Sequence, residues 1–397
     1  MKEVLRKDYL DSIDRFRDKK GFVKVITGVR RCGKSTLLRQ FTEKLKASGA
    51  EKIITMNFET IDFDHIRKYE DLNKFIKENV DPKEHTYLIM DEIQRVAEWE
   101  RSVNGLLAGY DADIYITGSN AHVLSSELST FLTGRYVTIS MFPLSFSEYY
   151  ELHSDIEKDE SVMFDRYMRY GAFPWVDPFN DDRTIRVMLS DLYGSIAYND
   201  VMYREQIRDR GDLDKVIRFL MINIGNPISS NSIAKSLGGI RRETAERYLK
   251  LLEEAYMFYK ADRFDLKSTA LSPTPKYYSV DTGLRNAPLG YRDEDRGRLM
   301  ENIVYLELRR RGYIVRIGKY GSGEIDFTAT DPNGAVEYFQ VTVSMMSDET
   351  RARELRPLKV LNDNFPKTVI STDSRLPSVT GEGIKHIHII DWLLKRA

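Results

Sequence analysis

The stretch FVKVITGVRRCGKSTLLRQF, residues 22–41, indicates the fold class of this chain. An apolar and β-branched run, FVKVIT, is followed by a loop with the pattern G-x4-G-K-[ST] and then by an amphipathic run. The order strand, glycine-rich loop and helix predicts a phosphate-binding P-loop. In such a loop, backbone N–H groups and the positive end of the helix dipole face the phosphate oxygens. The alternative is a chance glycine turn before a helix, and the strand in front of the loop argues against it.

The loop residues predict a nucleoside triphosphate as the ligand. Lys34 is expected to reach its β- and γ-phosphates, and the hydroxyl of Ser35 is expected to ligate Mg²⁺. ATP and Mg²⁺ are therefore the predicted cofactors. The residues expected to line the phosphate site are Gly28, Arg31, Cys32, Gly33, Lys34, Ser35 and Thr36.

Two further apolar runs end in polar residues that suit hydrolysis. TYLIMDE, residues 86–92, ends in Asp91, expected to hold Mg²⁺ through water, and Glu92, the predicted general base. IYITGSN, residues 114–120, ends in Asn120, which should bond the γ-phosphate or the attacking water if this strand lies between the other two. A solvated Asp-Glu turn is the alternative for residues 91 and 92. The second carboxylate favours hydrolysis over phosphoryl transfer.

Arg135 lies in a Thr-Gly-Arg turn before the run YVTISMF. We expect it at the edge of the nucleotide cleft, facing away from its own γ-phosphate, where it could supply transition-state charge to a neighbouring subunit. A plain surface arginine is an equally good interpretation. The catalytic role would require a homo-oligomer.

Six separated motifs occur in an order that resembles a known family. They are ITGVRRCGKSTLL, YLIMDEIQ, ITGSN, LTGRY, FPLSF and YGAFPWV. Their order resembles the archaeal and bacterial AAA-type ATPases that carry an AAA_14 domain and, behind it, a DUF4143 region. The similarity extends over nearly the whole chain. It implies phosphate, metal, base and sensor roles for the loop and strand-end residues named above, and an arginine-finger position for Arg135.

A chain of 397 residues is long enough for two or three domains. The expected fold class is α/β, with a P-loop ATPase core of the AAA+ type, built on a parallel sheet, over residues 1–150. Helices predicted over 151–210 resemble the lid that follows such cores, with breaks at Gly171 and Pro174. Residues 211–285 are expected to form a winged helix-turn-helix. Residues 286–397 are expected to form an α/β domain similar to the PD-(D/E)xK nucleases.

The composition favours a globular protein in a reducing compartment. No apolar run approaches the length of a membrane span, and the charged N-terminal residues argue against a secretory signal. The single cysteine, Cys32, excludes an internal disulfide and a cysteine-based metal site, so a cytoplasmic location is expected. With 60 basic and 61 acidic residues the formal net charge is -1, so no overall field attracts the chain to DNA.

The sequence of segment 211–285 does not decide whether it binds DNA or a protein. Its third predicted helix begins RRETAERYLK and carries Arg241, Arg242 and Arg247, which could meet DNA phosphates or bases in a major groove. The same helix carries four glutamates, and winged helices also bind proteins. DNA and an acidic partner protein are therefore both possible partners.

The last segment contains an incomplete nuclease motif. Glu301, Asp326 and Gln340 stand where the metal-binding residues of a PD-(D/E)xK site are expected, and Thr342 stands where the lysine is expected. Because threonine carries no ammonium charge, we expect a degenerate nuclease fold kept for binding or assembly. An active nuclease is the alternative.

Two classes of function remain open at the level of sequence. The first is a Mg²⁺-dependent ATPase whose nucleotide state repositions the winged helix and the end domain on DNA. The second is a slow, nucleotide-switched protein–protein interaction or signalling ATPase without nucleic acid. A phosphotransferase is a weaker third class, because Glu92 favours water as the acceptor.

Overall fold

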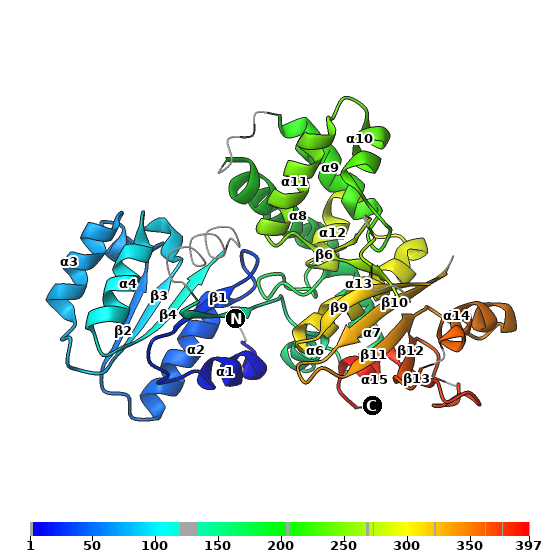
Figure 1. The fold of residues 1–397 in the computed structure, drawn as a ribbon, viewed down its shortest axis with the longest axis horizontal. Helices are drawn as coiled ribbons and strands as arrows, with labels where there is room; N and C mark the ends of the chain where they lie inside the picture. The colour runs from blue at the N-terminus through cyan, green and yellow to red at the C-terminus, as the bar shows by residue number, and fades with distance from the viewer. Residues whose placement is uncertain are drawn as a thin grey trace. The chain divides into compact units, whose positions relative to one another are not determined.

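The computed structural model describes residues 3–119, 134–203, 207, 209–266, 270–272, 274–320, 323–361, 363–374 and 376–396. Internal contacts divide the chain into two compact units (Figure 1). The first contains Met1–Pro143 with Glu254–Tyr256, and the second contains Leu144–Glu253 with Met257–Ala397. The main border lies close to residue 150, where the ATPase core was expected to end. Apart from Glu254–Tyr256, the lid, winged-helix and end segments predicted behind it lie in the second unit.

The described part of the first unit contains one sheet of five strands. Their bounds are β1 Val23–Thr27, β2 Ile53–Asn57, β3 Thr86–Asp91, β4 Ala112–Gly118 and β5 Tyr136–Ser140. The order across the sheet is β2-β3-β4-β1-β5, and every neighbouring pair is parallel. The predicted α/β class with a parallel central sheet is thereby confirmed. So is the insertion of β4 between the two motif strands, β1 and β3.

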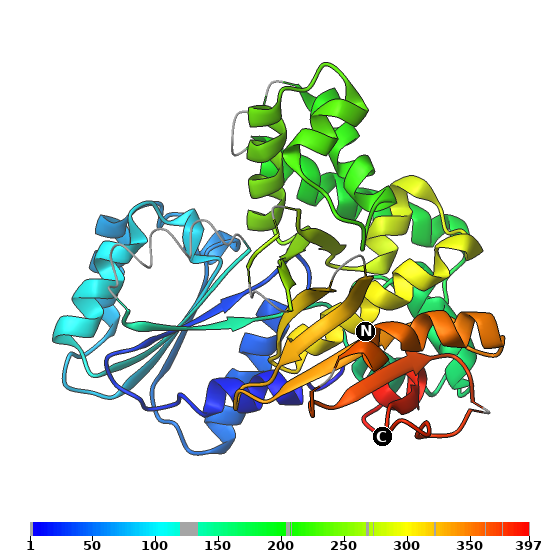
Figure 2. The same cartoon turned by 45° about the vertical axis from the view of Figure 1, so that its right-hand side comes forward.

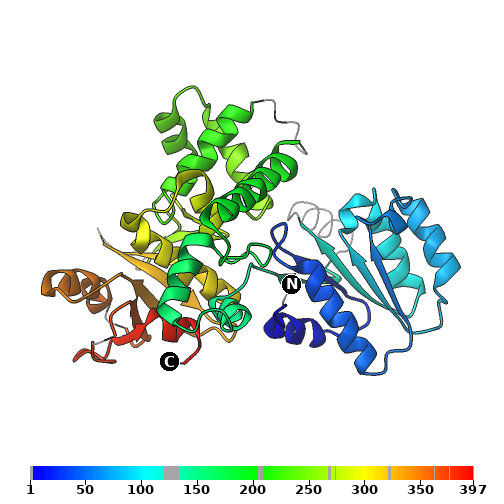
Figure 3. The ribbon, with the colours of Figure 1, turned by 180° about the vertical axis from the view of Figure 1, so that it is seen from behind.

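Helices cover both faces of this sheet (Figures 1 and 3). On one face lie α1 (Lys7–Asp14) and α2 (Lys34–Ala47), where Phe41 packs against Tyr115 with 4.7 Å between ring centroids. On the other lie α3 (Tyr69–Asn79) and α4 (Trp99–Gly109), which share a core with alternate residues of β1, β3 and β4. Because successive side chains of a strand point to opposite faces, the central strands are buried on both sides and form continuous apolar runs. Two short 3₁₀ helices, η1 (Ile61–Phe63) and η2 (Ile93–Arg95), follow β2 and β3.

The second unit begins with a series of helices. Gly171, with φ 76°, ends α7, so the chain breaks where the glycine predicted a break. A π-helix, η3 (Ser195–Tyr203), continues α8 directly. The bounds are α6 Phe146–His153, α7 Glu160–Tyr170, α8 Asp182–Gly194, α9 Arg210–Ile222, α10 Ser230–Leu237 and α11 Arg242–Glu254.

In the described part of the second unit, six strands form a mixed sheet in the order β13-β12-β11-β10-β9-β7 (Figure 2). β9, β10 and β11 are antiparallel neighbours, whereas β11, β12 and β13 run parallel. β6 (Phe258–Ala261) and β8 (Lys276–Ser279) form a separate antiparallel pair. The sheet strands are β7 Arg263–Asp265, β9 Ile314–Tyr320, β10 Gly323–Thr330, β11 Val336–Val341, β12 Lys367–Ser371 and β13 Lys385–His388.

Aromatic stacking and aliphatic packing hold this sheet to its helices. Tyr278 of β8 stacks on Tyr305 of α13 with 4.2 Å between ring centroids, and both rings lie near Phe327 of β10. α14 packs through Leu355 and Leu358 into the core of the same sheet. The remaining helices are α12 Thr282–Leu289, η4 Asp293–Asp295, α13 Arg296–Arg310, α14 Asp348–Val360 and α15 Ile389–Leu393. No helix among the described residues has the length and apolarity needed to cross a membrane.

Candidate nucleotide-binding site

The loop between β1 and α2 has a backbone that only a few residue types adopt easily. Gly28, Arg31 and Gly33 have positive φ angles of 151°, 64° and 107°. A side chain at Gly28 would place its Cβ 2.2 Å from the carbonyl oxygen of Met141, so the close approach to the end of β5 requires glycine. α2 begins at Lys34, immediately after this loop. The first turn of a helix presents N–H groups that have no partner within the helix, so a helix that begins directly after this loop has the arrangement that binds phosphate.

The Lys34 side chain is buried and folds back on its own loop. Its Nζ donates hydrogen bonds to the carbonyl oxygens of Gly28 at 3.0 Å and Val29 at 3.2 Å. The same atom lies 3.8 Å from Oε1 of Glu92. These oxygens satisfy the buried ammonium. Phosphate oxygens are equivalent acceptors, so a nucleotide can replace them without leaving the charge unpartnered.

Asp91, at the carboxyl end of β3, receives hydrogen bonds from the neighbouring elements. Asn57 at the end of β2 donates through Nδ2 at 3.2 Å, and Thr117 of β4 donates through its hydroxyl. Burial raises the pKa of the Asp91 carboxyl, while hydrogen bonds from Thr117 and Ser35 oppose the rise. Because Ser35 reaches Asp91, a hydroxyl and a carboxylate oxygen lie together, and both are ligand types that Mg²⁺ accepts.

Glu92 has the left-handed backbone conformation, with φ 54°. Its backbone N–H donates to the hydroxyl of Thr117 at 2.9 Å. Its carboxylate accepts hydrogen bonds from the amide of Gln94 and, at 3.3 Å, from the hydroxyl of Ser119. A non-glycine residue rarely adopts this conformation, and such residues cluster at functional sites. With this turn, the carboxylate of Glu92 lies 3.8 Å from Nζ of Lys34.

The structure brings together Lys34, Ser35, Asp91 and Glu92, as the sequence predicted. Asn120 lies outside the described residues. Sequence reasoning missed three side chains that hold the two carboxylates: Asn57, Thr117 and Gln94. A signal for the first two was present, because Asn57 and Thr117 are polar residues at the ends of apolar runs, and the carboxyl ends of parallel strands share one edge of a sheet.

The other predicted loop residues have different environments. Arg31 is exposed and Thr36 is half-buried. Cys32 is fully buried, and burial raises the pKa of its thiol. The thiol therefore stays protonated and acts as a small filler beneath the loop. Any contact of residue 32 with phosphate must come from its backbone.

Arg135 lies at the opposite edge of the sheet from the P-loop. It precedes Tyr136, which pairs with Val23 at the amino end of β1, and its carbonyl accepts a hydrogen bond from the Val23 N–H. Its guanidinium donates to Asn104 of α4 at 2.9 Å. The expectation that Arg135 lies at the edge of the nucleotide cleft is therefore wrong, because the parallel register fixes it at the amino edge. A role in a neighbouring subunit stays a prediction.

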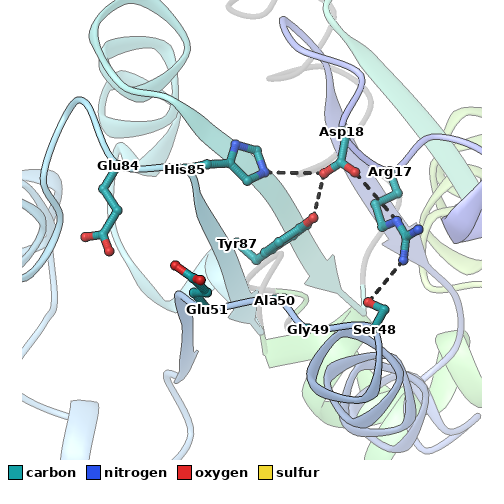
Figure 4. Close-up of a pocket in the computed structure, with 9 residues that line it drawn as sticks. All are labelled: Arg17, Asp18, Ser48, Gly49, Ala50, Glu51, Glu84, His85 and Tyr87. Carbon is teal, nitrogen blue, oxygen red and sulfur yellow. Dashed lines mark hydrogen bonds and ion pairs between the residues drawn. The ribbon is translucent and has the colours of Figure 1, made fainter.

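A pocket of about 360 Å³ in the first unit also lies away from the P-loop (Figure 4). His85, just before β3, lies 3.3 Å from Asp18 and 3.0 Å from Asp111, and Tyr87 donates to Asp18 at 2.6 Å. These side chains bind one another at the amino edge of the sheet. The pocket therefore presents an internal hydrogen-bond cluster and is not the nucleotide site.

The predicted motif residues of the end segment also come together. The N–H of Asp326 donates to the amide oxygen of Gln340 at 3.4 Å, and burial followed by the charge of Glu301 raises the pKa of Asp326 well above its usual range. Lys276 of β8, which sequence reasoning missed, lies 3.2 Å from Glu301 and 2.6 Å from Glu324. Among the described residues, no group of three or more histidine, cysteine or acidic side chains is arranged to hold a metal ion.

Two family models match this chain. Residues 20–150 match AAA_14, described as an AAA domain, which confirms the predicted AAA-type domain at the P-loop. Residues 162–295 match DUF8612, a domain of unknown function. The DUF4143 region expected behind the ATPase core is not confirmed, since the match in this part of the chain is to DUF8612.

Among solved structures, the likeness is weak. The Holliday junction branch migration motor RuvB of Thermotoga maritima is 13% identical and covers 65% of this chain and 90% of its own, with a TM-score of 0.34. The ORC1 protein of Aeropyrum pernix, solved in complex with DNA, is 11% identical and covers 72% and 92%, with a TM-score of 0.33. Scores of this size carry no information about function.

Two relatives match along most of their length. An uncharacterized protein of Haemophilus influenzae is 37% identical over 404 residues, which cover 99% of each chain. An uncharacterized protein of Methanocaldococcus jannaschii is 31% identical over 391 residues, which cover 92% of this chain and 86% of its own. The chain therefore belongs to one family with these two proteins, and within it residues 20–150 form an AAA-type ATPase domain.

Proposed function

We propose that this protein is a Mg²⁺-dependent ATPase whose nucleotide state repositions its second unit on DNA. The observation that supports ATP hydrolysis is the close arrangement of Lys34, Asp91 and Glu92 at the carboxyl edge of the first sheet. An ammonium, a carboxylate beside a serine hydroxyl, and a second carboxylate facing the ammonium are the groups that ATP hydrolysis requires.

Each of these groups has a separate task in the proposed reaction. The loop N–H groups and Lys34 bind the phosphates, with Lys34 exchanging the carbonyls of its own loop for phosphate oxygens. Ser35 and Asp91 would hold Mg²⁺, which supplies positive charge to the transferred phosphoryl group. Glu92 orients the attacking water and accepts its proton. Thr117 positions both carboxylates because one hydroxyl donates to Asp91 and accepts from the Glu92 N–H.

Two variants separate binding from turnover. Lys34→Ala should raise the Kd for ATP by about 100-fold or more, because a charged donor to the phosphates is lost. Glu92→Gln should leave the Kd nearly unchanged and lower kcat by roughly 10²- to 10⁴-fold, because the general base acts only on the attacking water. Calorimetry gives the Kd, and phosphate release gives kcat.

The matched control for Lys34 is Lys46→Ala, an exposed lysine of the same helix. It should bind and hydrolyse ATP like the wild type. Equal ATP affinity in the wild type and the Lys34 variant would falsify the assignment of this loop as the nucleotide site.

We further propose that Arg135 acts in a neighbouring subunit of a homo-oligomer. Its place at the amino edge of its own sheet leaves it unable to serve its own P-loop, which supports a role across a subunit contact. Its bond to Asn104 holds it on the exposed side of α4. A structural role for that bond is the alternative.

Arg135→Ala should lower the turnover rate by roughly 10³-fold without weakening ATP binding, as expected for loss of an arginine finger. Mixing it with the Lys34→Ala protein should restore part of the activity, because one partner keeps an intact nucleotide site and the other keeps the arginine. Specific activity of the wild type should rise with protein concentration. No recovery in mixtures that light scattering shows to co-assemble would mean that Arg135 does not act in trans.

We propose that α9, α10, α11 and the β6–β8 pair form a winged helix-turn-helix that binds DNA. Three helices are followed by an antiparallel strand pair, and Gly238 and Gly239, both with positive φ, form the turn before α11. α11 buries Tyr248 and Leu252 on one face. Arg241, Arg242 and Arg247 are exposed, which suits contacts to phosphates and bases.

DNA at low ionic strength should raise the ATPase rate several-fold. The double variant Arg241→Ala/Arg242→Ala should lose most of this stimulation and reduce the salt slope of binding by about one unit per lost phosphate contact. Arg186→Ala, on the exposed face of α8, is the control and should behave like the wild type. A rate that DNA leaves unchanged, with no DNA binding in 50 mM salt, would favour the protein–protein signalling alternative.

We also propose that the end segment is a degenerate PD-(D/E)xK-like fold. Lys276 contributes an ammonium group from a different strand than the nuclease motif requires, and its side chain is only 5% exposed. It binds Glu301 and Glu324, and Arg263 binds the other oxygen of Glu324 at 2.8 Å. Glu301 and Glu324 are therefore neutralised by the chain itself, which leaves these two carboxylates with little demand for a metal ion.

We also propose a cytoplasmic location, on the ground that the chain contains a single cysteine.

The purified protein should not cut plasmid DNA with either Mg²⁺ or Mn²⁺. Lys276→Met should instead destabilise the second unit by up to about 3 kcal/mol, because it leaves the partly buried carboxylates of Glu301 and Glu324 without their buried ammonium partner. Lys260→Met, an exposed lysine of β6, is the control for urea denaturation. Metal-dependent cutting that disappears in an Asp326→Ala variant would overturn the degenerate assignment.

A further inference from the structure

The proposed reaction makes no use of Arg6, a buried side chain of the segment before α1. Arg6 is only 2% exposed. Its Nη1 donates to the carbonyl oxygen of Cys32 at 3.1 Å. Its Nη2 donates to the carbonyl oxygen of Phe142 at 2.9 Å and approaches that of Pro143 at 3.5 Å. One guanidinium therefore connects two backbone segments that are far apart in sequence.

One of these backbone segments belongs to the P-loop, and the other directly precedes the second unit in the chain. Cys32 lies inside the P-loop, two residues before Lys34. Phe142 and Pro143 are the last residues of the first unit before the chain enters the second unit at Leu144. Arg6 thus connects the phosphate-binding loop to the residues just before Leu144; we call residues 141–143 the exit segment.

Neighbouring contacts hold Arg6 in this position. Its backbone N–H donates to Gln40 of α2 at 3.2 Å, and Gln40 in turn donates to the carbonyl of Val4 at 2.9 Å. The guanidinium lies over the ring of Tyr9, 4.8 Å from its centroid. The hydroxyl of Tyr9 accepts a hydrogen bond from the N–H of Phe142 at 3.1 Å. Tyr9 of α1 therefore contacts both the arginine and the exit segment, and α2 holds the backbone of Arg6 through Gln40.

The P-loop also contacts the exit segment directly. The N–H of Met141 donates to the carbonyl of Thr27 at 2.7 Å, and Gly28 approaches the carbonyl of Met141 too closely to allow a side chain. Lys34 holds the carbonyls of Gly28 and Val29 in this structure. In the proposed binding of phosphate, Lys34 would release these carbonyls. Because Gly28 packs directly against the carbonyl of Met141, a shift of Gly28 would also move the exit segment.

We infer that Arg6 is a positioning residue that couples the nucleotide state of the P-loop to the exit segment, residues 141–143, which directly precedes the second unit in the chain. The inference rests on the proposed binding of ATP at this loop. Arginine suits the task because its planar fork reaches two carbonyls at once, whereas a lysine is a single point charge on a flexible stem. Arg6 does not touch the phosphates and acts through the backbone of the loop.

Hydrogen exchange of the intact protein tests this coupling. The reporter is a peptide that contains the amides of Met141 and Phe142, both of which are hydrogen-bonded in this structure. A non-hydrolysable ATP analogue with Mg²⁺ should change exchange in this peptide as well as in the P-loop of the wild type. In Arg6→Lys at saturating analogue, the P-loop should still respond and the 141–142 peptide should lose most of its response.

Equilibrium and steady-state measurements give a second readout. Arg6→Lys should raise the Kd for the analogue up to about tenfold, since a charge-assisted hydrogen bond to the loop is lost. It should change kcat less than twofold, because the loop binds the ground state and the transition state alike. Arg15→Lys, an exposed arginine directly after α1, is the control and should match the wild type in every measurement.

The outcomes separate the coupling from the proposed function. A wild type that binds the analogue, with no change of exchange at Met141 and Phe142, would overturn the coupling alone. An Arg6→Lys protein that keeps the full response would do the same. A wild type that does not bind the analogue by calorimetry would overturn both the coupling and ATP binding. The wild-type comparison requires no variant to fold.

Discussion

The parallel pairing of β4 with both β1 and β3 is the constraint on which the nucleotide site depends. In this register Thr27 lies beside Gly118, and Met90 lies beside Ile116. The carboxyl ends of three strands therefore meet at one edge, although they come from separate parts of the chain. Thr117 can bridge Asp91 and Glu92 only because β4 lies next to β3. A shift of β4 by one residue would turn Thr117 to the opposite face and remove its bonds to both carboxylates.

Burying charge at this edge is costly, and the structure offsets the cost with neutral donors and acceptors. Asp91 receives hydrogen bonds from Asn57 and Thr117, and Lys34 donates to two carbonyls of its own loop. Preorganised groups of this kind stabilise developing charge without rearranging during the reaction. The same contacts explain why the Glu92 turn keeps a strained backbone conformation, because its N–H is fixed by Thr117.

The sequence predicted those residues of the site that lie close together in the chain, within short motifs. The P-loop, Asp91 and Glu92 lie within short motifs, and their strands follow from apolar runs that need no partner to be recognised. Asn57 and Thr117 also end apolar runs, but their hydrogen bonds to Asp91 depend on the register of β2 and β4 beside β3, which the sequence does not specify. Arg135 was placed at the wrong edge for the same reason, since only the pairing of Tyr136 with Val23 fixes its position. Lys276 was missed because its carboxylate partners are contributed by α13 and β10, far along the chain.

Two of the buried lysines, Lys34 and Lys276, show how one chain can use the same charged group in opposite ways. Lys34 donates its hydrogen bonds to backbone carbonyls, which are neutral acceptors, and the carboxylate of Glu92 lies further away, at 3.8 Å. An anionic ligand is a stronger partner than these carbonyls, so the arrangement favours exchange. Lys276 binds Glu301 and Glu324, and Arg263 completes the neutralisation of Glu324. Its partners already carry full opposite charge, so an incoming ligand would have to break buried ion pairs to enter. The first arrangement suits a site that opens to a substrate, and the second suits a part of the fold that stays closed.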